Sequence, residues 1–269
     1  MYQEDDSLLT QRKSAVIWLH RVQQSIEQER LVLYGQAIAP ARVSEKEEIY
    51  GIEILLRMKG ASGDVILPGA FLPAMQRFNF SGRLDRWVVA QALMLMTEDS
   101  GIDGDISVVS LNISGQSIGD RSFKDHVLEA LERSKVPGDK ICFEITETVA
   151  ISNLVAAQAF IASLKERGCR FALDDFGSGF SSFAHLKGLD VDYVKIDGSL
   201  VKGMVKGDVD QAMVRSITEI GQLMDKQVIA EWVEDETTRD QLCSLGVDFV
   251  QGFAVSRPVP IANFQNVLH

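Results

Sequence analysis

The sequence predicts an α/β protein whose strands close into a single barrel. Strand-like and helix-like segments alternate along most of the chain, a pattern that produces a mostly parallel sheet. The chain has 269 residues, close to the length of about 250 residues that is typical of an α/β barrel. Acidic and amide side chains also recur where the expected strands end, and a parallel barrel gathers such ends at one rim.

The composition fits an ordinary globular protein, with 46% hydrophobic and 24% charged residues. A net charge of −11 argues against a surface for DNA or RNA polymers, because such surfaces need clustered Lys and Arg. An acidic chain can still bind a small phosphorylated ligand when divalent cations screen the charges. The three cysteines form no CxxC pair, so buried, inert thiols are favoured over disulfides or a zinc site.

The sequence carries no signal-peptide pattern and no apolar run long enough to span a membrane. We therefore expect a cytoplasmic protein, or the cytoplasmic portion of a larger membrane-anchored one. Apolar residues recur at helical spacing from Ser14 to about Arg30, whereas residues 1–12 are polar and expected to fray. We assign residues 1–30 to an N-terminal linker helix and residues 31–269 to the barrel domain.

The secondary structure of the barrel domain follows from apolar periodicity. The expected strands cover residues 31–38, 48–58, 106–113, 140–146, 169–174, 192–196, 228–232 and 249–253. The expected helices cover residues 68–78, 82–96, 122–134, 150–167, 181–187, 208–224 and 235–245. A polar connection joins the first two strands and suits antiparallel pairing between them.

One strand end carries two adjacent carboxylates. The apolar run 171–173 stops at Asp174 and Asp175, and Gly177 and Gly179 follow. Neighbouring like charges repel, so they are favourable only when they are exposed or when a cation lies between them. Taken alone, this stretch fits an acidic surface turn as well as a metal site.

Other strand ends carry side chains of the same kind. They are Glu53, Arg57, Asn112, Glu144, Glu147, Lys195, Asp197, Glu231, Glu234 and Gln251. Each one alone could be a helix cap or a solvated loop residue, but their recurrence at successive strand ends favours a shared site. Carboxylates and an Asn carbonyl without histidine suit hard cations such as Mg²⁺ or Mn²⁺, which typically act on phosphates.

The order of these residues resembles the EAL domain family, the bacterial phosphodiesterase domain specific for cyclic di-GMP. The signature Glu-Ala-Leu of that family appears here as Glu53-Ile54-Leu55. The further blocks are Leu-Asn-Ile-Ser at 111–114, Glu-Ile-Thr-Glu at 144–147, Asp-Asp-Phe-Gly at 174–177, Lys-Ile-Asp at 195–197, Ala-Glu-Trp-Val-Glu at 230–234 and Gln-Gly-Phe at 251–253. The match spans about residues 31–260, and an ordered set of this length is highly specific.

The resemblance implies a modified TIM (β/α)8 barrel whose first strand runs antiparallel. It also implies metal-dependent hydrolysis of cyclic di-GMP to linear 5′-pGpG, by water attack on one phosphodiester, which lowers this bacterial second messenger. The expected cofactors are Mg²⁺ or Mn²⁺, two ions per site. The implied metal ligands are Glu53, Asn112, Glu144, Asp174, Asp175 and Glu231.

The implied catalytic residues are Glu53, Lys195 and Glu231. Lys195 either accepts a proton from the attacking water, which requires a lowered pKa, or orients hydroxide and steadies the phosphate charge. Glu147 is expected to anchor the loop after Asp175. The implied substrate-binding residues are Gln36, Leu55, Arg57, Asp85, Asp197, Glu234 and Gln251.

Three of these binding residues suit particular groups of the substrate. The guanidinium fork of Arg57 suits a phosphate, and Gln36 and Asp85 are candidate guanine contacts. The alternative for Asp85 is a surface helix acid. Ile54 and Trp232 stand where the family usually has Ala and Gly. Strand alternation turns Ile54 away from Glu53, and it places Trp232 either against the helices or at the rim beside the ligand.

Two other functions compete with the phosphodiesterase. A degenerate EAL domain could bind cyclic di-GMP as a receptor without cutting it, but such receptors typically lack several ligands and this chain lacks none. An unrelated Mg²⁺-dependent barrel enzyme would explain the acids but not the ordered motifs. The resemblance further implies a homodimer, and the leading helix suggests fusion to an upstream GGDEF or sensory domain.

Overall fold

The computed structural model describes residues 2–43, 48–97, 106–178, 183–205 and 207–267. Its strands form one ten-stranded sheet in the order β10-β1-β9-β8-β7-β6-β5-β4-β2-β3, and β1 also pairs with β2. Strands β3 (Val65–Ile66) and β10 (Val259–Pro260) are two-residue additions. The remaining eight strands therefore close into a barrel.

The first strand of this barrel is antiparallel and the other strands are parallel. β1 (Leu31–Pro40) runs antiparallel to both β2 (Gly51–Lys59) and β9 (Phe249–Gln251). All the pairings from β2 through β4 to β9 are parallel. The strands between them are β4 (Val108–Asn112), β5 (Ile141–Thr146), β6 (Arg170–Phe176), β7 (Tyr193–Ile196) and β8 (Gln227–Ala230). The predicted fold is confirmed.

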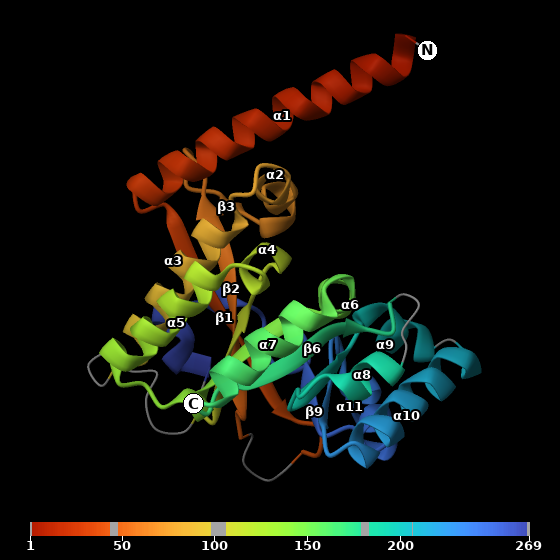
Figure 1. Cartoon of the computed structure of the whole chain (residues 1–269). Helices are drawn as coiled ribbons and strands as arrows, with labels where there is room; N and C mark the ends of the chain where they lie inside the picture. Colours follow the sequence, from red (N-terminus) through yellow and green to blue (C-terminus); the bar gives the residue numbers. More distant parts are fainter. Residues whose placement is uncertain (1, 44–47, 98–105, 179–182, 206, 268–269) are drawn as a thin grey trace.

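Helices lie around the outside of the strands (Figure 1). The α-helices are α2 (Leu72–Arg77), α3 (Ser81–Leu95), α4 (Gly115–Ile118), α5 (Arg121–Ser134), α6 (Glu147–Ser152), α7 (Leu154–Lys165), α8 (Phe183–Gly188), α9 (Gly198–Met204), α10 (Asp208–Leu223) and α11 (Glu236–Ser244). The 3₁₀ helices are η1 (Pro68–Ala70), η2 (Gly138–Lys140) and η3 (Ile261–Val267).

The predicted helix over 150–167 is divided in the structure. Asn153 leaves the helical conformation, and its side chain accepts a hydrogen bond from the Ala156 N–H at 3.3 Å. This side chain caps α7 and separates it from α6, as Asn commonly does at a helix start. Apolar periodicity does not detect such a break, because the buried residues Ala150 of α6 and Ala157 of α7 lie seven residues apart and fit one continuous helical pattern.

The N-terminal helix is longer than the sequence predicts. α1 spans Tyr2–Glu27, so the expectation that residues 1–12 fray is wrong for all but Met1, which lies outside the described residues. Six of the residues from Tyr2 to Arg12 are Gln, Glu, Leu or Arg, which are good helix formers and can continue an anchored helix without an apolar face. Figure 1 shows the N-terminal part of α1 projecting away from the barrel.

The C-terminal half of α1 is anchored to the barrel domain by its own small core. Ala15 and Val22 are buried in a cluster with Met58, Phe71 and Met75, which come from β2 and the segment before α3. The role of residues 1–30 as a linker stays a prediction. None of the helices in the described parts of the chain is long and apolar enough to cross a membrane.

The end of the barrel where the parallel strands begin is closed by aromatic rings and an arginine. The ring of Tyr50 stacks on Phe249 with centroids 4.0 Å apart, and its hydroxyl lies 2.6 Å from that of Tyr193. Arg170 Nη1 donates to both hydroxyls, at 2.9 Å and 2.7 Å. Because these side chains fill this end of the barrel, the polar side chains are accessible only from the opposite end.

Candidate active site

A buried lysine lies at the centre of the polar strand ends. Lys195 on β7 has no exposed surface. Its Nζ lies 2.7 Å from Glu144 Oε2 and 2.7 Å from Glu231 Oε1, and it is 3.4 Å from Glu53 Oε2 and 3.6 Å from Asp174 Oδ1. These carboxylates come from β2, β5 and β6 and from the residue after β8. The polar side chains of these strands therefore converge, as the sequence predicts.

Glu53 is oriented by two amides. Asn112 Nδ2, at the end of β4, donates to Glu53 Oε1 at 2.7 Å, and Gln251 Nε2, at the end of β9, donates to Glu53 Oε2 at 2.6 Å. Burial raises the pKa of Glu53, but Lys195 and these hydrogen bonds outweigh burial and leave the pKa below its ordinary value. Glu53 is thus held as a carboxylate.

The two adjacent aspartates depart from regular strand geometry. In a regular strand, neighbouring side chains face opposite sides. Here the register between β6 and β7 shifts between Leu173 and Phe176, and Asp175 has a φ of 55°. Asp tolerates this left-handed conformation better than most residues. As a result, Asp174, Asp175 and Glu231 each place one carboxylate oxygen within 4.8 Å of the others.

The carboxylates outnumber the ammonium group that they surround. Burial raises the pKa of Glu231 to about 8, although Lys195 opposes the shift. Burial also raises the pKa of Glu144 well above its ordinary value. For Lys195, burial lowers the pKa, but the surrounding carboxylates outweigh burial and raise it well above its ordinary value. The cluster has an excess of acidic groups that further positive charge would stabilise.

The donor set fits a hard divalent cation. Glu144 Oε1 and Gln251 Oε1 are buried without a hydrogen-bond partner among the described residues. A buried oxygen in this state is costly, and a bound ion is one of its ordinary explanations. Carboxylate and amide oxygens are the ligands that Mg²⁺ and Mn²⁺ prefer. The residues present could therefore hold such an ion.

A cavity of about 700 Å³ opens beside this cluster, and Glu53 and Glu231 line it. Five predicted substrate-binding residues line it as well: Gln36, Leu55, Arg57, Glu234 and Gln251. Arg57 Nη1 donates to the Leu56 carbonyl at 2.9 Å, and its guanidinium lies over the ring of Tyr34, 5.6 Å from the centroid. The cavity thus joins the acidic cluster to a cationic fork.

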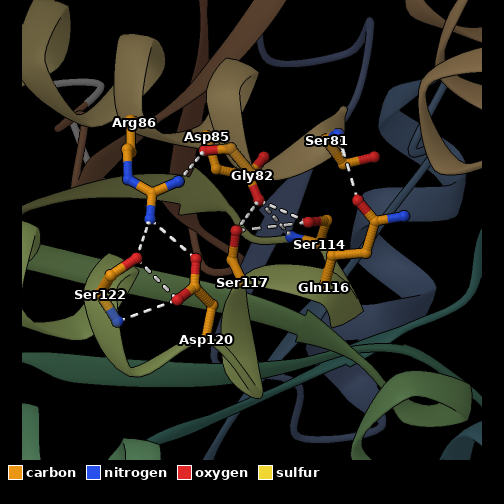
Figure 2. Close-up of polar contacts among 9 residues, drawn as sticks. All are labelled: Ser81, Gly82, Asp85, Arg86, Ser114, Gln116, Ser117, Asp120 and Ser122. Carbon is orange, nitrogen blue, oxygen red and sulfur yellow. Dashed lines mark hydrogen bonds and ion pairs between the residues drawn. The ribbon is translucent and has the colours of Figure 1, made fainter. Parts of the chain in front are cut away.

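Two predicted substrate-binding residues make contacts with their own fold instead. Asp85 Oδ2 accepts from the Ser114 N–H at 3.0 Å and from the hydroxyls of Ser114 and Ser117, both at 2.6 Å (Figure 2). Asp197 caps α9 and accepts from the Ser199 N–H at 2.9 Å. Neither lines the cavity. Their roles in substrate binding stay predictions.

Asp85 belongs to a network that ties α3 to α4 and α5. Figure 2 shows Arg86, the next residue, donating to Asp120 Oδ2 and to the Ser122 hydroxyl, both at 2.7 Å. Gln116 Oε1 accepts from the Ser81 N–H at 3.2 Å. Asp85 is neither a surface acid nor a cavity residue, and this contact pattern is that of a structural anchor.

Replacing Asp85 with Ala is expected to lower the free energy of unfolding by about 1–3 kcal/mol, because three donors lose a partly buried acceptor. Urea unfolding checks the change. The matched control is Asp125→Ala on the exposed face of α5, which should shift stability by less than about 0.5 kcal/mol. Unchanged stability together with a raised KM for a guanine nucleotide would contradict the structural role.

Three further residues singled out in the sequence are Glu147, Ile54 and Trp232. Glu147 is buried at the start of α6, directly after β5. The loop that it is expected to anchor includes residues 179–182, which lie outside the described residues, so the anchoring role stays a prediction. Ile54 is buried in the hydrophobic core, on the side away from Glu53 as alternation predicts. Trp232 lies at the cavity rim and is 58% exposed.

Sequence reasoning missed part of the cavity wall. Tyr34, Val65, Leu67 and Arg257 line the cavity but belong to no motif block. Tyr34 lies two residues before Gln36 on β1, so alternation along this strand could have indicated a shared face. Arg257 lies beyond the last barrel strand, where no periodic pattern constrains its position.

Comparisons with known proteins agree on one family. The EAL domain family matches residues 19–258. Cyclic di-GMP phosphodiesterase PdeB of Shewanella oneidensis is 36% identical over 98% of this chain and 30% of its own length. Cyclic di-GMP phosphodiesterase PdeF of Escherichia coli is 34% identical over 94% of this chain and 33% of its own length. The chain thus spans about a third of the length of these curated relatives.

Solved structures show the same fold. The PaMucR phosphodiesterase in complex with c-di-GMP superposes with a TM-score of 0.84 at 29% identity, covering 92% of this chain and 99% of that one. The FimX EAL domain from Pseudomonas aeruginosa bound to c-di-GMP gives a TM-score of 0.82 at 25% identity, covering 91% of this chain and 97% of that one.

Proposed function

The chain belongs to the EAL domain family, and on that premise we propose that it hydrolyses cyclic di-GMP to linear 5′-pGpG with the help of Mg²⁺ or Mn²⁺. The relatives PdeB and PdeF carry the name cyclic di-GMP phosphodiesterase. The single observation that carries the proposal is the complete acidic cluster around Lys195 beside a cavity of about 700 Å³.

The proposed cation ligands are Glu53, Asn112, Glu144, Asp174, Asp175 and Glu231. A bound pair of such cations supplies a water of lowered pKa and offsets the charge that develops on the phosphate. Glu53 is already fixed for this task by Asn112 and Gln251. Three of the proposed ligands, Asp174, Asp175 and Glu231, already place one carboxylate oxygen each within 4.8 Å of one another.

The substrate phosphate is proposed to meet Arg57 at the cavity wall, because a guanidinium fork can hold two phosphate oxygens. Water oxygen then bonds to phosphorus while the bond from phosphorus to the 3′ oxygen breaks. The 3′ oxygen takes up a proton, and the product keeps a 5′ phosphate. Lys195 is proposed to steady the phosphate charge rather than to accept the water's proton, since the neighbouring carboxylates favour its ammonium form.

The proposal is tested by incubating the protein with cyclic di-GMP and either Mg²⁺ or Mn²⁺, and then with excess EDTA. We expect pGpG to appear only with free metal. Tight binding of cyclic di-GMP without any product would instead indicate the receptor function. Neither binding nor product would contradict both the phosphodiesterase and the receptor function.

The affinity for Mn²⁺ is expected to rise with pH between pH 6 and about 8. Below its pKa of about 8, Glu231 holds a proton in the metal-free protein, and a cation must displace that proton. One displaced proton weakens binding about tenfold for each pH unit below 8. Calorimetric titration between pH 6 and pH 9, in buffers of different ionisation enthalpy, measures both affinity and proton release. Equal affinity at pH 6 and pH 9 would contradict the displacement.

Assembly is a separate proposal. MucR of Pseudomonas aeruginosa, 30% identical over 90% of this chain and 35% of its own length, is named a bifunctional diguanylate cyclase and cyclic di-GMP phosphodiesterase. Its greater length supports, for this chain, an upstream GGDEF or sensory domain joined through α1. The homodimer stays a prediction, which sedimentation of the chain at several concentrations checks.

A further inference from the structure

Trp232 adopts a backbone conformation that its own side chain disfavours. Its φ is 57°, a left-handed value that suits Gly and is unfavourable for a bulky residue. The neighbours on both sides are fixed: Glu231 contacts Lys195 at 2.7 Å, and the Val233 N–H donates to the Gln251 carbonyl at 3.0 Å. Strain of this kind persists where the surrounding structure holds it, and such positions cluster at functional sites.

The indole has a prepared position. Gly198, at the start of α9, has no side chain, and a Cβ added there would overlap the Trp232 ring. Lys202, one helical turn further along α9, holds its Nζ 3.9 Å from the ring centroid, where an ammonium interacts favourably with an aromatic face. Lys202 is also paired with Glu234, at 3.3 Å, and Glu234 itself lines the cavity.

Trp232 is nevertheless 58% exposed, and it borders the cavity next to Glu231. Its ring is therefore available to a ligand in this cavity, and an exposed aromatic face is a surface on which a base can stack. Arg57 and two of the proposed cation ligands, Glu53 and Glu231, line the same cavity, so a ligand with a flat aromatic end and an anionic end fits it. A nucleotide meets both requirements.

We propose that Trp232 is the stacking platform for one guanine base of cyclic di-GMP, held in place by Gly198 and Lys202. This inference rests on the proposed function and extends it by naming a residue that sets base affinity. Lys202 draws electron density on one face of the indole, and the cavity side of the ring receives the base. Stacking on an aromatic side chain tolerates any base, so selectivity for guanine comes from other cavity residues.

The test uses three variants of Trp232 and follows both binding and turnover. Trp232→Gly removes the ring and relieves the left-handed strain, so it should fold with a Tm within a few degrees of the parent. Its KM for cyclic di-GMP should rise about tenfold or more, with kcat changed much less, because the ring contacts a base and not the reacting phosphate. Trp232→Phe should restore KM to within about threefold, whereas Trp232→Leu should not.

Binding measured by calorimetry in EDTA gives a readout that needs no turnover. The Kd should follow the same order as KM across the variants, and Leu223→Ala, at an exposed position away from the cavity, should leave it unchanged. A Trp232→Gly protein with KM and Kd within twofold of the parent would overturn the platform. So would a Trp232→Phe protein as impaired as Trp232→Gly. If the parent chain binds cyclic di-GMP without cutting it, the proposed hydrolysis is wrong, but the Kd values of the variants still test whether Trp232 stacks on a base. If the parent chain neither binds nor cuts cyclic di-GMP, both proposals are wrong.

Discussion

Replacing Glu144 with Gln is expected to lower kcat for cyclic di-GMP by about a thousandfold or more. The variant keeps the size of the side chain but loses one of the charges that would hold a cation, and metal-assisted steps gain several kcal/mol from that cation. The variant also loses the ion pair between Glu144 and Lys195, whose atoms Oε2 and Nζ lie 2.7 Å apart. A neutral amide cannot form an ion pair with the ammonium group. Initial rates of pGpG formation at saturating Mn²⁺ measure the loss.

Two comparisons make this result specific. Glu129→Gln changes an exposed carboxylate on α5 and should retain full activity. Circular dichroism should show that the Glu144 variant is folded, since its side chain is isosteric. Activity of the Glu144 variant within tenfold of the parent would contradict its role as a cation ligand.

Replacing Lys195 with Met is expected to lower kcat by about a hundredfold to a thousandfold. The substitution removes the only ammonium within the carboxylate cluster described above, and charge stabilisation at a reacting phosphate contributes on this scale. Lys195→Arg should retain clearly more activity than Lys195→Met, because Arg keeps the positive charge. Arg cannot accept a proton at neutral pH, so an active Arg variant excludes the proton-acceptor role.

The Lys195 variants need a check of folding, since the side chain is fully buried. Lys59→Met, at an exposed end of β2, is the control for loss of a lysine and should be neutral. Thermal unfolding of each protein separates a packing defect from a chemical one. A folded Lys195→Met protein with parental kcat would contradict both roles considered for this lysine.

Much of the barrel could be predicted from local patterns. Strand and helix periodicities depend only on residues that are close in the sequence. They therefore predict all eight barrel strands, with strand ends that differ from those in the structure by a few residues. The antiparallel first strand was indicated by the polar connection between residues 38 and 48 and by the family resemblance. The split of the helix at Asn153 and the extension of α1 to Tyr2 depend on capping and anchoring, which periodicity does not report.

The site was predictable to the extent that it lies on the barrel strands. Glu53, Glu144, Asp174 and Glu231 converge on Lys195 because barrel closure dictates it. The approach of Asp175 to the same point depends on a register shift between β6 and β7, which arises from tertiary pairing. The hydrogen bonds that engage Asp85 come from α4 and the residue before it, and the cavity wall at Arg257 comes from a loop. The apolar periodicity of the sequence does not predict such contacts between segments that are far apart in the chain.

The most direct test of hydrolysis at this site is the reaction of cyclic di-GMP in water enriched in ¹⁸O, with Mn²⁺ present. Water attack on one phosphodiester predicts pGpG that carries one ¹⁸O atom in its 5′ phosphate, as seen by mass spectrometry, and no labelled product when EDTA removes the metal. Product without label in that phosphate, or labelled product that still forms in EDTA, would contradict the account.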